Sequence, residues 1–275
     1  MTTPPRKLTP QEETRLEQVR RNFQERRDIS NKLDRIKTKI GVYSGKGGVG
    51  KTTVAVNLAV TLAEQGYAVA LFDCDIDCPN VGRMMMVNRL PEQKKGVFTP
   101  VVSHGVKVMS MTFFQRNEEE ATIWRGPMIH NAINQFTKLT EWGDLDYLVV
   151  DLPPGTSDAP LTVMQTLSID GFVVVTTPQE LAALDAKRSA NMIRKLNLVT
   201  YGIVENMAGE VFGSGAGEEL SDELELPFLG RFDMRTDYRS SKGPACLTSK
   251  PIKAEYELFT RQLINTHQRH ALLVK

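Results

Sequence analysis

The residues best suited to chemistry form one glycine-rich segment. In order they are Gly45, Lys46, Gly47, Gly48, Val49, Gly50, Lys51, Thr52 and Thr53. The segment matches the phosphate-binding pattern G-x-x-x-x-G-K-[ST] and carries an extra lysine inside the loop. Glycines let the backbone wrap around a polyphosphate and direct N–H groups at it. We therefore expect the segment to bind a nucleotide, with Lys51 on the terminal phosphates and the Thr52 hydroxyl on Mg²⁺.

A second chemical cluster begins with Asp151, directly after the apolar run 147–150. A carboxylate at the end of a buried strand can hold Mg²⁺, directly or through water, beside a nucleotide. Asp151 alone could equally be a helix cap, but the phosphate loop favours the metal-binding role. Two prolines then precede Gly155, whose N–H can approach the terminal phosphate.

Three aspartates, Asp73, Asp75 and Asp77, alternate with other residues after another apolar run. Carboxylates so close together repel each other unless cations or helix ends offset their charge. We expect Asp75 to orient the attacking water; the alternative is that these acids are solvated loop residues or caps. Cys74 and Cys78 lie in the same segment and could be ligands of an iron–sulfur or zinc site. Two thiols are half of a four-ligand set, so small buried side chains are the favoured interpretation.

These clusters need a scaffold that brings them together. Strands are predicted over 39–43, 67–72, 106–109, 147–151, 172–176, 199–204 and 228–229, and helices over 54–63, 127–139, 160–167, 181–196 and 255–270. This alternation predicts an α/β fold with a mostly parallel sheet and helices on both faces. Ligands of such sheets bind beyond the carboxyl ends of the strands, where the phosphate loop and both acidic clusters fall.

We divide the chain into an N-terminal helical arm, 1–36, and a nucleotide-binding domain, 37–275. Thr9, Pro10 and Glu12 form a helix-start signal, and apolar residues recur along the arm at near-helical spacing. Basic residues outnumber acidic ones in the arm. We expect a helix packed on its own domain with a solvated basic face, rather than an arm that binds nucleic acid.

Composition excludes several classes of protein. The 275 residues are 41% hydrophobic and 24% charged, and the net charge of +1 gives no general attraction to nucleic acid or an anionic membrane. No apolar run approaches the length of a membrane span, and residues 1–6 lack the apolar core of a signal peptide. The three cysteines are too few for a disulfide framework. We therefore expect a cytoplasmic protein without a membrane partner.

Lys46 gives the loop the deviant Walker A form of the MinD/ParA-like ATPases, and further segments resemble the Mrp-type iron–sulfur cluster carrier ATPases. They are 44–52, 123–128, 146–156, 175–179 and the Glu-Asn-Met at 205–207. The resemblance is collinear over about 37–244. It implies a P-loop ATPase of iron–sulfur cluster assembly, a cytoplasmic homodimer with ATP near the interface. By the same resemblance, Lys46 would act on the partner's phosphates and Asn206 would contact adenine.

The segment 31–34 fits the Asn-Lys-x-Asp pattern of guanine-specific sites. It precedes the phosphate loop and lies in a helical pattern, so it cannot line the base pocket of this fold. We therefore favour ATP over GTP.

One feature of the Mrp-type carriers is missing. Mrp-type carriers usually have a Cys-x-x-Cys soon after Glu-Asn-Met, and each subunit gives two thiolates to a bridging 4Fe–4S cluster. Here the stretch 208–217 has no cysteine, neither has the arm, and the Asp-Cys-Pro at 77–79 also departs from the family pattern. Two hypotheses follow. The chain is an ATPase of cluster assembly with an unidentified protein client, or a cluster-free, ATP-switched dimer that recruits a protein partner.

Overall fold

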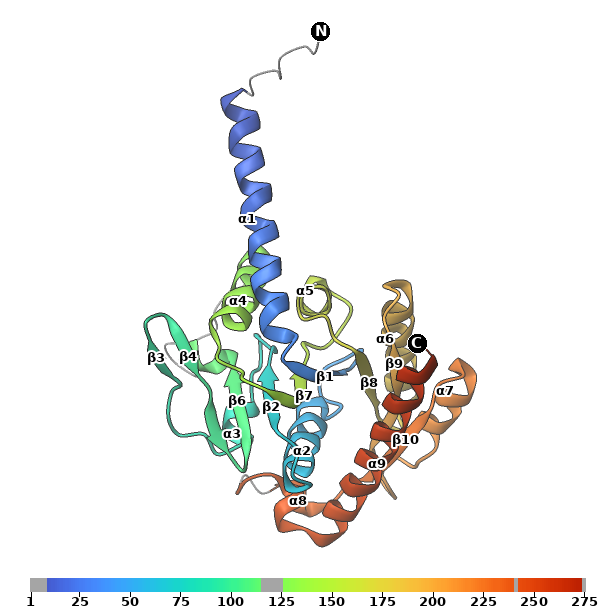
Figure 1. Cartoon of the computed structure of the whole chain (residues 1–275). Coiled ribbons are helices and arrows are strands. Elements are labelled where there is room, and N and C mark those ends of the chain that lie inside the picture. Colours follow the sequence, from blue (N-terminus) through green and yellow to red (C-terminus); the bar gives the residue numbers. More distant parts are fainter. Residues whose placement is uncertain (1–8, 115–125, 240–241, 274–275) are drawn as a thin grey trace.

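The computed structural model describes residues 9–114, 126–239 and 242–273 and has an α/β fold (Figure 1). Eight strands form one sheet in the order β10-β9-β8-β1-β7-β2-β6-β5. Neighbouring strands are parallel except β5, which runs antiparallel to β6 at the edge. The mostly parallel sheet predicted from the sequence is confirmed.

The central strands are buried along nearly their whole length, which is why they appear in the sequence as unbroken apolar runs. The strands of the sheet are β1 (Ile36–Tyr43), β2 (Val69–Asp73), β5 (Val101–Ser103), β6 (Val106–Ser110), β7 (Leu145–Asp151), β8 (Gly171–Thr176), β9 (Thr200–Ala208) and β10 (Phe228–Asp233). A separate antiparallel hairpin consists of β3 (Glu92–Lys94) and β4 (Val97–Thr99).

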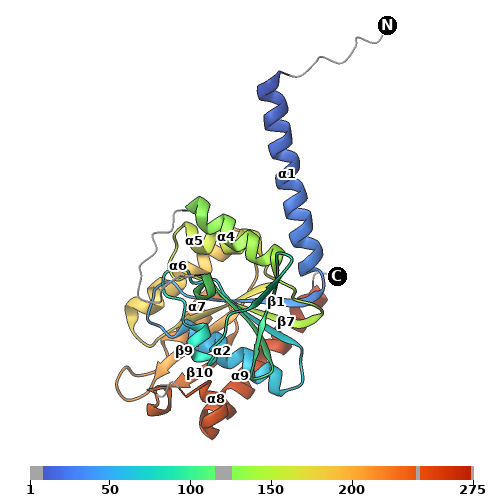
Figure 2. The same cartoon turned by 90° about the vertical axis from the view of Figure 1, so that its left-hand side faces the viewer.

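Helices cover both faces of the sheet, and each face has its own buried apolar cluster (Figure 2). One face packs against α1 (Pro10–Leu33), α4 (Gly126–Leu139), α5 (Asp158–Thr166), α6 (Glu180–Lys195) and α7 (Ala216–Leu224). The other packs against α2 (Lys51–Glu64), α3 (Val81–Met84), α8 (Ala245–Thr248) and α9 (Lys250–Leu273). Short 3-10 turns occupy Met111–Phe114 and Thr236–Arg239. In the described ranges, no helix has both the length and the apolarity that a membrane crossing requires.

Helix α1 projects from the domain (Figures 1 and 2). Its start is the predicted capping box, in which Glu12 N–H donates to Thr9 Oγ1 at 3.3 Å and Thr9 N–H donates to Glu12 Oε2 at 2.8 Å. Ile29 and Leu33 are buried near α4, whereas Leu16 is exposed. The expectation of a helix packed on its domain therefore holds only for its last turns and is wrong for its N-terminal half.

Candidate nucleotide-binding site

The phosphate loop and both acidic clusters meet at one edge of the sheet. The loop joins β1 to α2, Asp151 ends β7 beside β1, and Asp73 ends β2 beside β7. The pairing register sets Asp73 directly opposite Asp151. The phosphate loop, Asp151 and Asp73 thus lie at the carboxyl ends of three adjacent parallel strands. This is the edge at which such sheets bind ligands.

The phosphate loop is held tightly from both sides. Gly50 has a φ of 82°, which favours glycine, and a Cβ there would lie 2.2 Å from Nδ2 of Asn206 on β9. At Gly45, a Cβ would lie 2.1 Å from the backbone oxygen of Asp185 on α6. Side chains at these two positions would force the loop apart. The free N–H groups at the start of α2 and the helix dipole add positive potential where a phosphate would bind.

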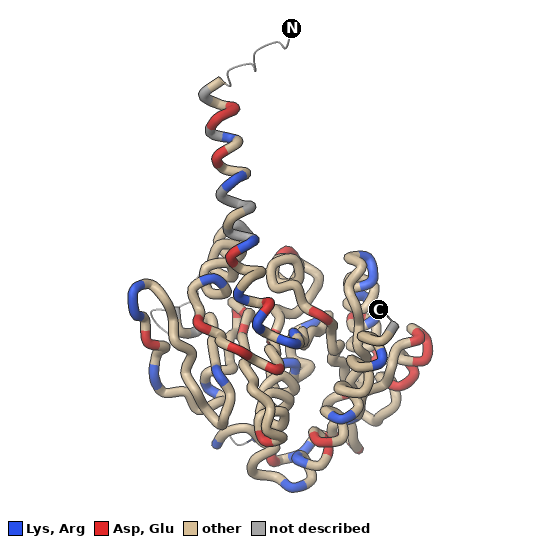
Figure 3. Tube along the Cα trace, viewed as in Figure 1, with Lys and Arg blue, Asp and Glu red and all other residues tan. Residues whose placement is uncertain are grey.

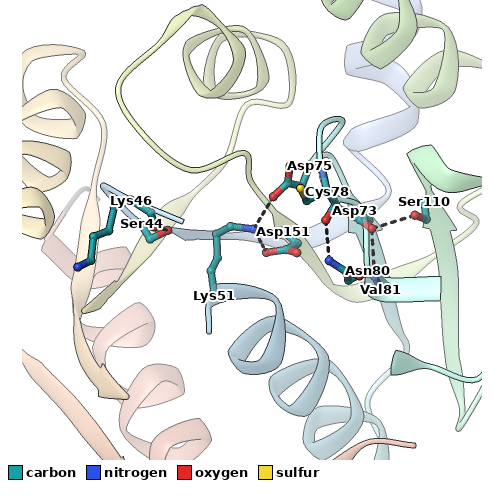
Figure 4. Close-up of polar contacts among 10 residues, drawn as sticks. All are labelled: Ser44, Lys46, Lys51, Asp73, Asp75, Cys78, Asn80, Val81, Ser110 and Asp151. Carbon is teal, nitrogen blue, oxygen red and sulfur yellow. Dashed lines mark hydrogen bonds and ion pairs between the residues drawn. The ribbon is translucent and has the colours of Figure 1, made fainter. Parts of the chain in front are cut away.

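Lys51 lies between two carboxylates (Figure 4). Its Nζ is 2.6 Å from Asp151 Oδ1 and 3.5 Å from Asp75 Oδ2, and all three side chains are buried. Burial lowers the pKa of Lys51, but the charges of Asp151 and Asp75 outweigh burial, so the net shift is upward. Lys51 is therefore a buried cation whose ammonium group is held by two carboxylates.

The second carboxylate oxygen of Asp151, Oδ2, takes no part in the contact with Lys51. Asp151 Oδ2 is buried and has no hydrogen-bond partner among the described residues. An unsatisfied buried carboxylate oxygen is costly, and Mg²⁺ is a hard cation that prefers oxygen ligands. Thr52 lies in the first turn of α2 and interacts with the Asp151 carboxyl. These two side chains fit a magnesium ion that completes its coordination with water and phosphate oxygens.

Asp73 organises the segment that carries Asp75. Its Oδ2 accepts hydrogen bonds from Ser110 Oγ at 2.9 Å and from Val81 N–H at 3.2 Å, and its Oδ1 accepts one from Asp75 N–H at 3.2 Å. Burial, followed by the nearby charge of Asp151, raises the pKa of Asp73 to about 8. Sequence reasoning missed this positioning role; the available signal was a carboxylate at the end of an apolar strand, two residues before another.

Gly155 is already engaged in this structure. Its N–H donates to the Ser44 carbonyl oxygen at 2.9 Å, and its own carbonyl accepts the Tyr43 hydroxyl at 2.5 Å. The expected approach of this N–H to a phosphate therefore requires the bond to Ser44 to break. Tyr43 was not predicted to be part of the site, although a tyrosine that ends an aliphatic strand was a usable signal.

Lys46 and Asn206 have different surroundings. Lys46 is partly exposed and points away from Lys51 and Asp151 (Figure 4), and no described carboxylate pairs with it. Asn206 is buried, and its Nδ2 donates to the Val49 carbonyl oxygen of the phosphate loop at 2.9 Å. Lys46 is thus directed outward, while Asn206 is fixed against the loop.

The cysteine candidates are not gathered as a pair. Cys74 is fully buried in the apolar core, where burial and then the charge of Asp73 raise its thiol pKa well above the usual value. Cys78 is exposed, as is its neighbour Asp77. In the part of the chain that the structure describes, no three His, Cys, Asp or Glu side chains gather as a metal site. Cys74 has the buried position that sequence reasoning favoured for it, and Cys78 does not.

In the view of Figure 3, Lys and Arg positions alternate with Asp and Glu positions along the described chain and do not gather in one region. The segment 31–34, which fits the guanine pattern, lies at the end of α1, and Lys32 Nζ donates to the Thr140 carbonyl oxygen at 3.2 Å. This contact is with the start of the turn between α4 and β7, so the segment takes no part in the nucleotide-binding edge.

Residues 35–264 match the family model described as ParA, NUBPL iron-transfer P-loop NTPase. The chain belongs to this family. An iron–sulfur cluster carrier protein from Methanocaldococcus jannaschii is 40% identical over 252 residues, which cover 86% of this chain and 87% of that protein. One of the same name from Synechocystis sp. is 42% identical over 246 residues, which cover 83% of this chain and 69% of that protein. The resemblance to iron–sulfur carrier ATPases is confirmed.

Solved structures of the family and its fold agree with this assignment. A nucleotide-binding protein from Archaeoglobus fulgidus, solved with ADP, matches with a TM-score of 0.70 at 36% identity, covering 78% of this chain and 89% of that one. The cell division ATPase MinD from Pyrococcus furiosus has a TM-score of 0.63 at 20% identity, covering 85% and 99%. At 20% identity, the match to MinD shows a shared fold. The chain is a P-loop NTPase of the iron-transfer family.

Proposed function

We propose that this chain binds Mg–ATP, hydrolyses it slowly, and acts in iron–sulfur cluster assembly as a cytoplasmic, ATP-dependent homodimer. The observation that carries the proposal is the buried Lys51 between Asp151 and Asp75, at the head of the phosphate loop. A cation held in this way can transfer to the terminal phosphates of a nucleotide. The carboxylates that it leaves are then free for the metal ion and the attacking water.

Asp151 and Thr52 would hold Mg²⁺ in this proposal, supported by the unpartnered Oδ2 of Asp151. The ion would offset the charge of the phosphates to which it binds. Asp75, once released from Lys51, would orient the attacking water. Its position is fixed, because Asp75 Oδ1 accepts the Cys78 N–H at 3.3 Å and Asp73 holds its backbone. Positioning of this kind supplies much of the catalysis of phosphoryl transfer.

Asn206 supports the choice of ATP. Its bond to Val49 uses one N–H of the amide, so one oxygen acceptor and a second N–H remain. An asparagine amide with these two groups can pair with the amino group and an adjacent ring nitrogen of adenine. Guanine presents a carbonyl oxygen in place of that amino group, so the same amide orientation would leave donor and acceptor mismatched.

The place in cluster assembly rests on the names of the relatives, which are iron–sulfur cluster carrier proteins. The cluster is cargo in this proposal and is not part of the ATPase site. A second candidate, a cluster-free ATP switch that recruits a protein partner, is favoured by one observation: the buried Cys74 and the exposed Cys78 offer no paired thiolates. Both candidates share the ATP switch and an unidentified protein client. The free state of all three cysteines is compatible with a reducing cytoplasm.

Mg–ATP should both dimerise the chain and be hydrolysed by it. Lys46 points away from Lys51 and Asp151, which supports a role on the nucleotide of a partner subunit. We expect light scattering to give the mass of a dimer with Mg²⁺ and a non-hydrolysable ATP analogue, and of a monomer with ADP. Phosphate release from ATP should require Mg²⁺ and stop with EDTA. A monomer in every nucleotide state at micromolar concentration would contradict the shared site and the role of Lys46 in trans.

A further inference from the structure

Strand β9 is irregular at the point where it carries Asn206. Glu205 of β9 lies opposite Arg231 of β10. The next matched pair is Ala208 and Asp233, so β9 takes three steps where β10 takes two. The extra residue makes a β-bulge, a feature that redirects side chains and is frequent beside active sites. The regular alternation of side chains along β9 therefore stops at Asn206.

The bulge turns two consecutive side chains toward the phosphate loop. A Cβ at Gly50 would lie 2.2 Å from Asn206 Nδ2 and 3.4 Å from Met207 Cε. In a regular strand, consecutive side chains point to opposite faces of the sheet and would not both reach one glycine. Met207 has a φ of 59°, in the left-handed region. A residue other than glycine keeps this conformation only where its surroundings hold it.

The carboxylate of Glu205 provides such a hold from the other face of the sheet. It is fully buried, and both of its oxygens accept the Gly215 N–H at 3.0 Å. Its Oε2 also accepts the Gly217 N–H at 2.7 Å, and its Oε1 accepts Arg231 Nε at 2.8 Å. The two glycines lie at the start of α7, and Arg231 lies on β10. The carboxylate thus ties β9 to two neighbouring elements directly before the bulge.

A carboxylate is matched to this position because its contacts, two backbone N–H groups and a guanidinium, are all donors. Hydrogen bonds to an ionised carboxylate are roughly twice as strong as bonds between neutral groups. A glutamine amide in the same place would set its own NH₂ group against one of these donors. The substitution Glu205→Gln therefore loosens these contacts with little change in side-chain volume.

We propose that Glu205 is a positioning residue for the nucleotide base: by fixing the bulge, it holds Asn206 in the orientation that recognises adenine. This inference rests on the proposed function, in which Asn206 pairs with adenine. Glu205 is buried on the opposite face of the sheet from the phosphate loop, so it acts through Asn206. Lys51 and the N–H groups at the start of α2 are assigned to the phosphates, so the effect of Glu205 is confined to the base.

The test compares Mg–ATP with magnesium tripolyphosphate, which has the phosphates of ATP without its base, in calorimetric titrations of wild-type and Glu205→Gln protein. We expect the substitution to lower ATP affinity by at least about tenfold, or about 1.4 kcal/mol, because the base contact is lost. Tripolyphosphate affinity should stay within about twofold of wild type, and the preference for ATP over GTP should fall. A purely structural role would instead lower the affinities for ATP and tripolyphosphate together.

A double-variant cycle shows whether Glu205 acts through Asn206. Asn206→Ala should lower ATP affinity at least as much as Glu205→Gln does. Adding Glu205→Gln to Asn206→Ala should then lower it by less than about twofold more, because both substitutions remove the same contact. Additive losses of ATP affinity in the double variant would overturn the inference.

Glu218→Gln is the matched control. Glu218 is an exposed carboxylate of α7 that pairs with the same arginine, Arg231 Nη2, at 3.2 Å. This variant should bind ATP and tripolyphosphate like wild type. Thermal melting must show that each variant is folded. If Glu205→Gln does not fold, Arg231→Gln replaces it, because this variant removes the ion pair and leaves the backbone contacts of Glu205 in place; the same selective loss of ATP affinity is expected, by a smaller factor.

Two further results would contradict the inference. Folded Glu205→Gln protein that binds ATP like wild type, or that loses ATP and tripolyphosphate affinity equally, would remove the positioning role while Asn206 keeps its own. If Asn206→Ala binds ATP and discriminates against GTP as wild type does, the adenine contact in the proposed function is wrong, and the inference falls with it.

Discussion

Replacing Lys51 with alanine should weaken ATP binding severely. Lys51 is the buried cation at the head of the phosphate loop, and its positive charge is sustained by Asp151 and Asp75. Without it, the phosphates would meet two buried carboxylates with no cation between them. Loss of one partner from a buried charged contact commonly costs about 2–5 kcal/mol, so we expect ATP affinity to fall by roughly 30-fold to several thousandfold.

Calorimetric titration of Mg–ATP into wild-type and Lys51→Ala protein measures this change. Lys46→Ala is the matched control, since it removes a lysine from the same loop and should still bind ATP. Because Lys51→Ala leaves buried carboxylates unpaired, thermal melting must show that the variant is folded; Lys51→Gln, which keeps a hydrogen-bond donor, serves as the second variant. If folded Lys51→Ala binds ATP as tightly as wild type, the assignment of the phosphate loop is wrong.

Asp75→Ala and Lys46→Ala should keep ATP binding and lose most of the ATP turnover. In our proposal Asp75 orients the attacking water, and Lys46 stabilises charge on the nucleotide of a partner subunit. The loss of one such group commonly lowers the rate by about 10²–10³-fold. Asp75→Ala also removes one of the two ion pairs of Lys51, so its ATP affinity should not fall.

Phosphate release at saturating ATP, together with a binding titration, measures the two effects separately. Asp77→Ala is the matched control for Asp75, because Asp77 is an exposed carboxylate of the same segment. Its turnover should equal that of wild type. Unchanged turnover in both Asp75→Ala and Lys46→Ala would remove the catalytic roles assigned to them.

The main sheet was predictable because its central strands are buried on both faces and therefore apolar throughout. The strands β1, β7 and β8 and the helices α2, α6 and α9 lie where the sequence pattern places them. The elements that were missed are short or depend on distant contacts. Strands β3, β4 and β5 have three residues each, too few for a periodic pattern to emerge.

Helix α7 was missed for a different reason. Its start lies in the glycine-rich stretch 209–217, which locally indicates a loop, and its cap is the Glu205 carboxylate from another element. A capping contact between β9 and α7 leaves no local sequence signal. The ion pair between Lys51 and Asp151 likewise leaves no local signal, because the two residues are 100 positions apart in the sequence.

The sequence predicts which residues form the candidate site better than it predicts the contacts among them. The pattern of the phosphate loop and the aspartates at and after strand ends places Lys51, Asp75 and Asp151 together, and in the structure Lys51 contacts both carboxylates. The sequence could not reveal that Asp73 organises the segment around Asp75, or that Gly155 is bonded to Ser44. Both contacts depend on the register of neighbouring strands and loops.

The ATP switch should be complete in a chain that holds no stable cluster of its own. Anaerobic reconstitution with iron and sulfide, followed by iron, sulfide and phosphate-release assays on the same preparation, tests it most directly. Burial raises the pKa of the Cys74 thiol, and the carboxylates of Asp75 and Asp77 in the same segment add negative charge, so both oppose an anionic cluster. We expect Mg–ATP turnover without a stable stoichiometric cluster. About four irons and four sulfides per dimer, lost in Cys74→Ser/Cys78→Ser, would contradict the claim.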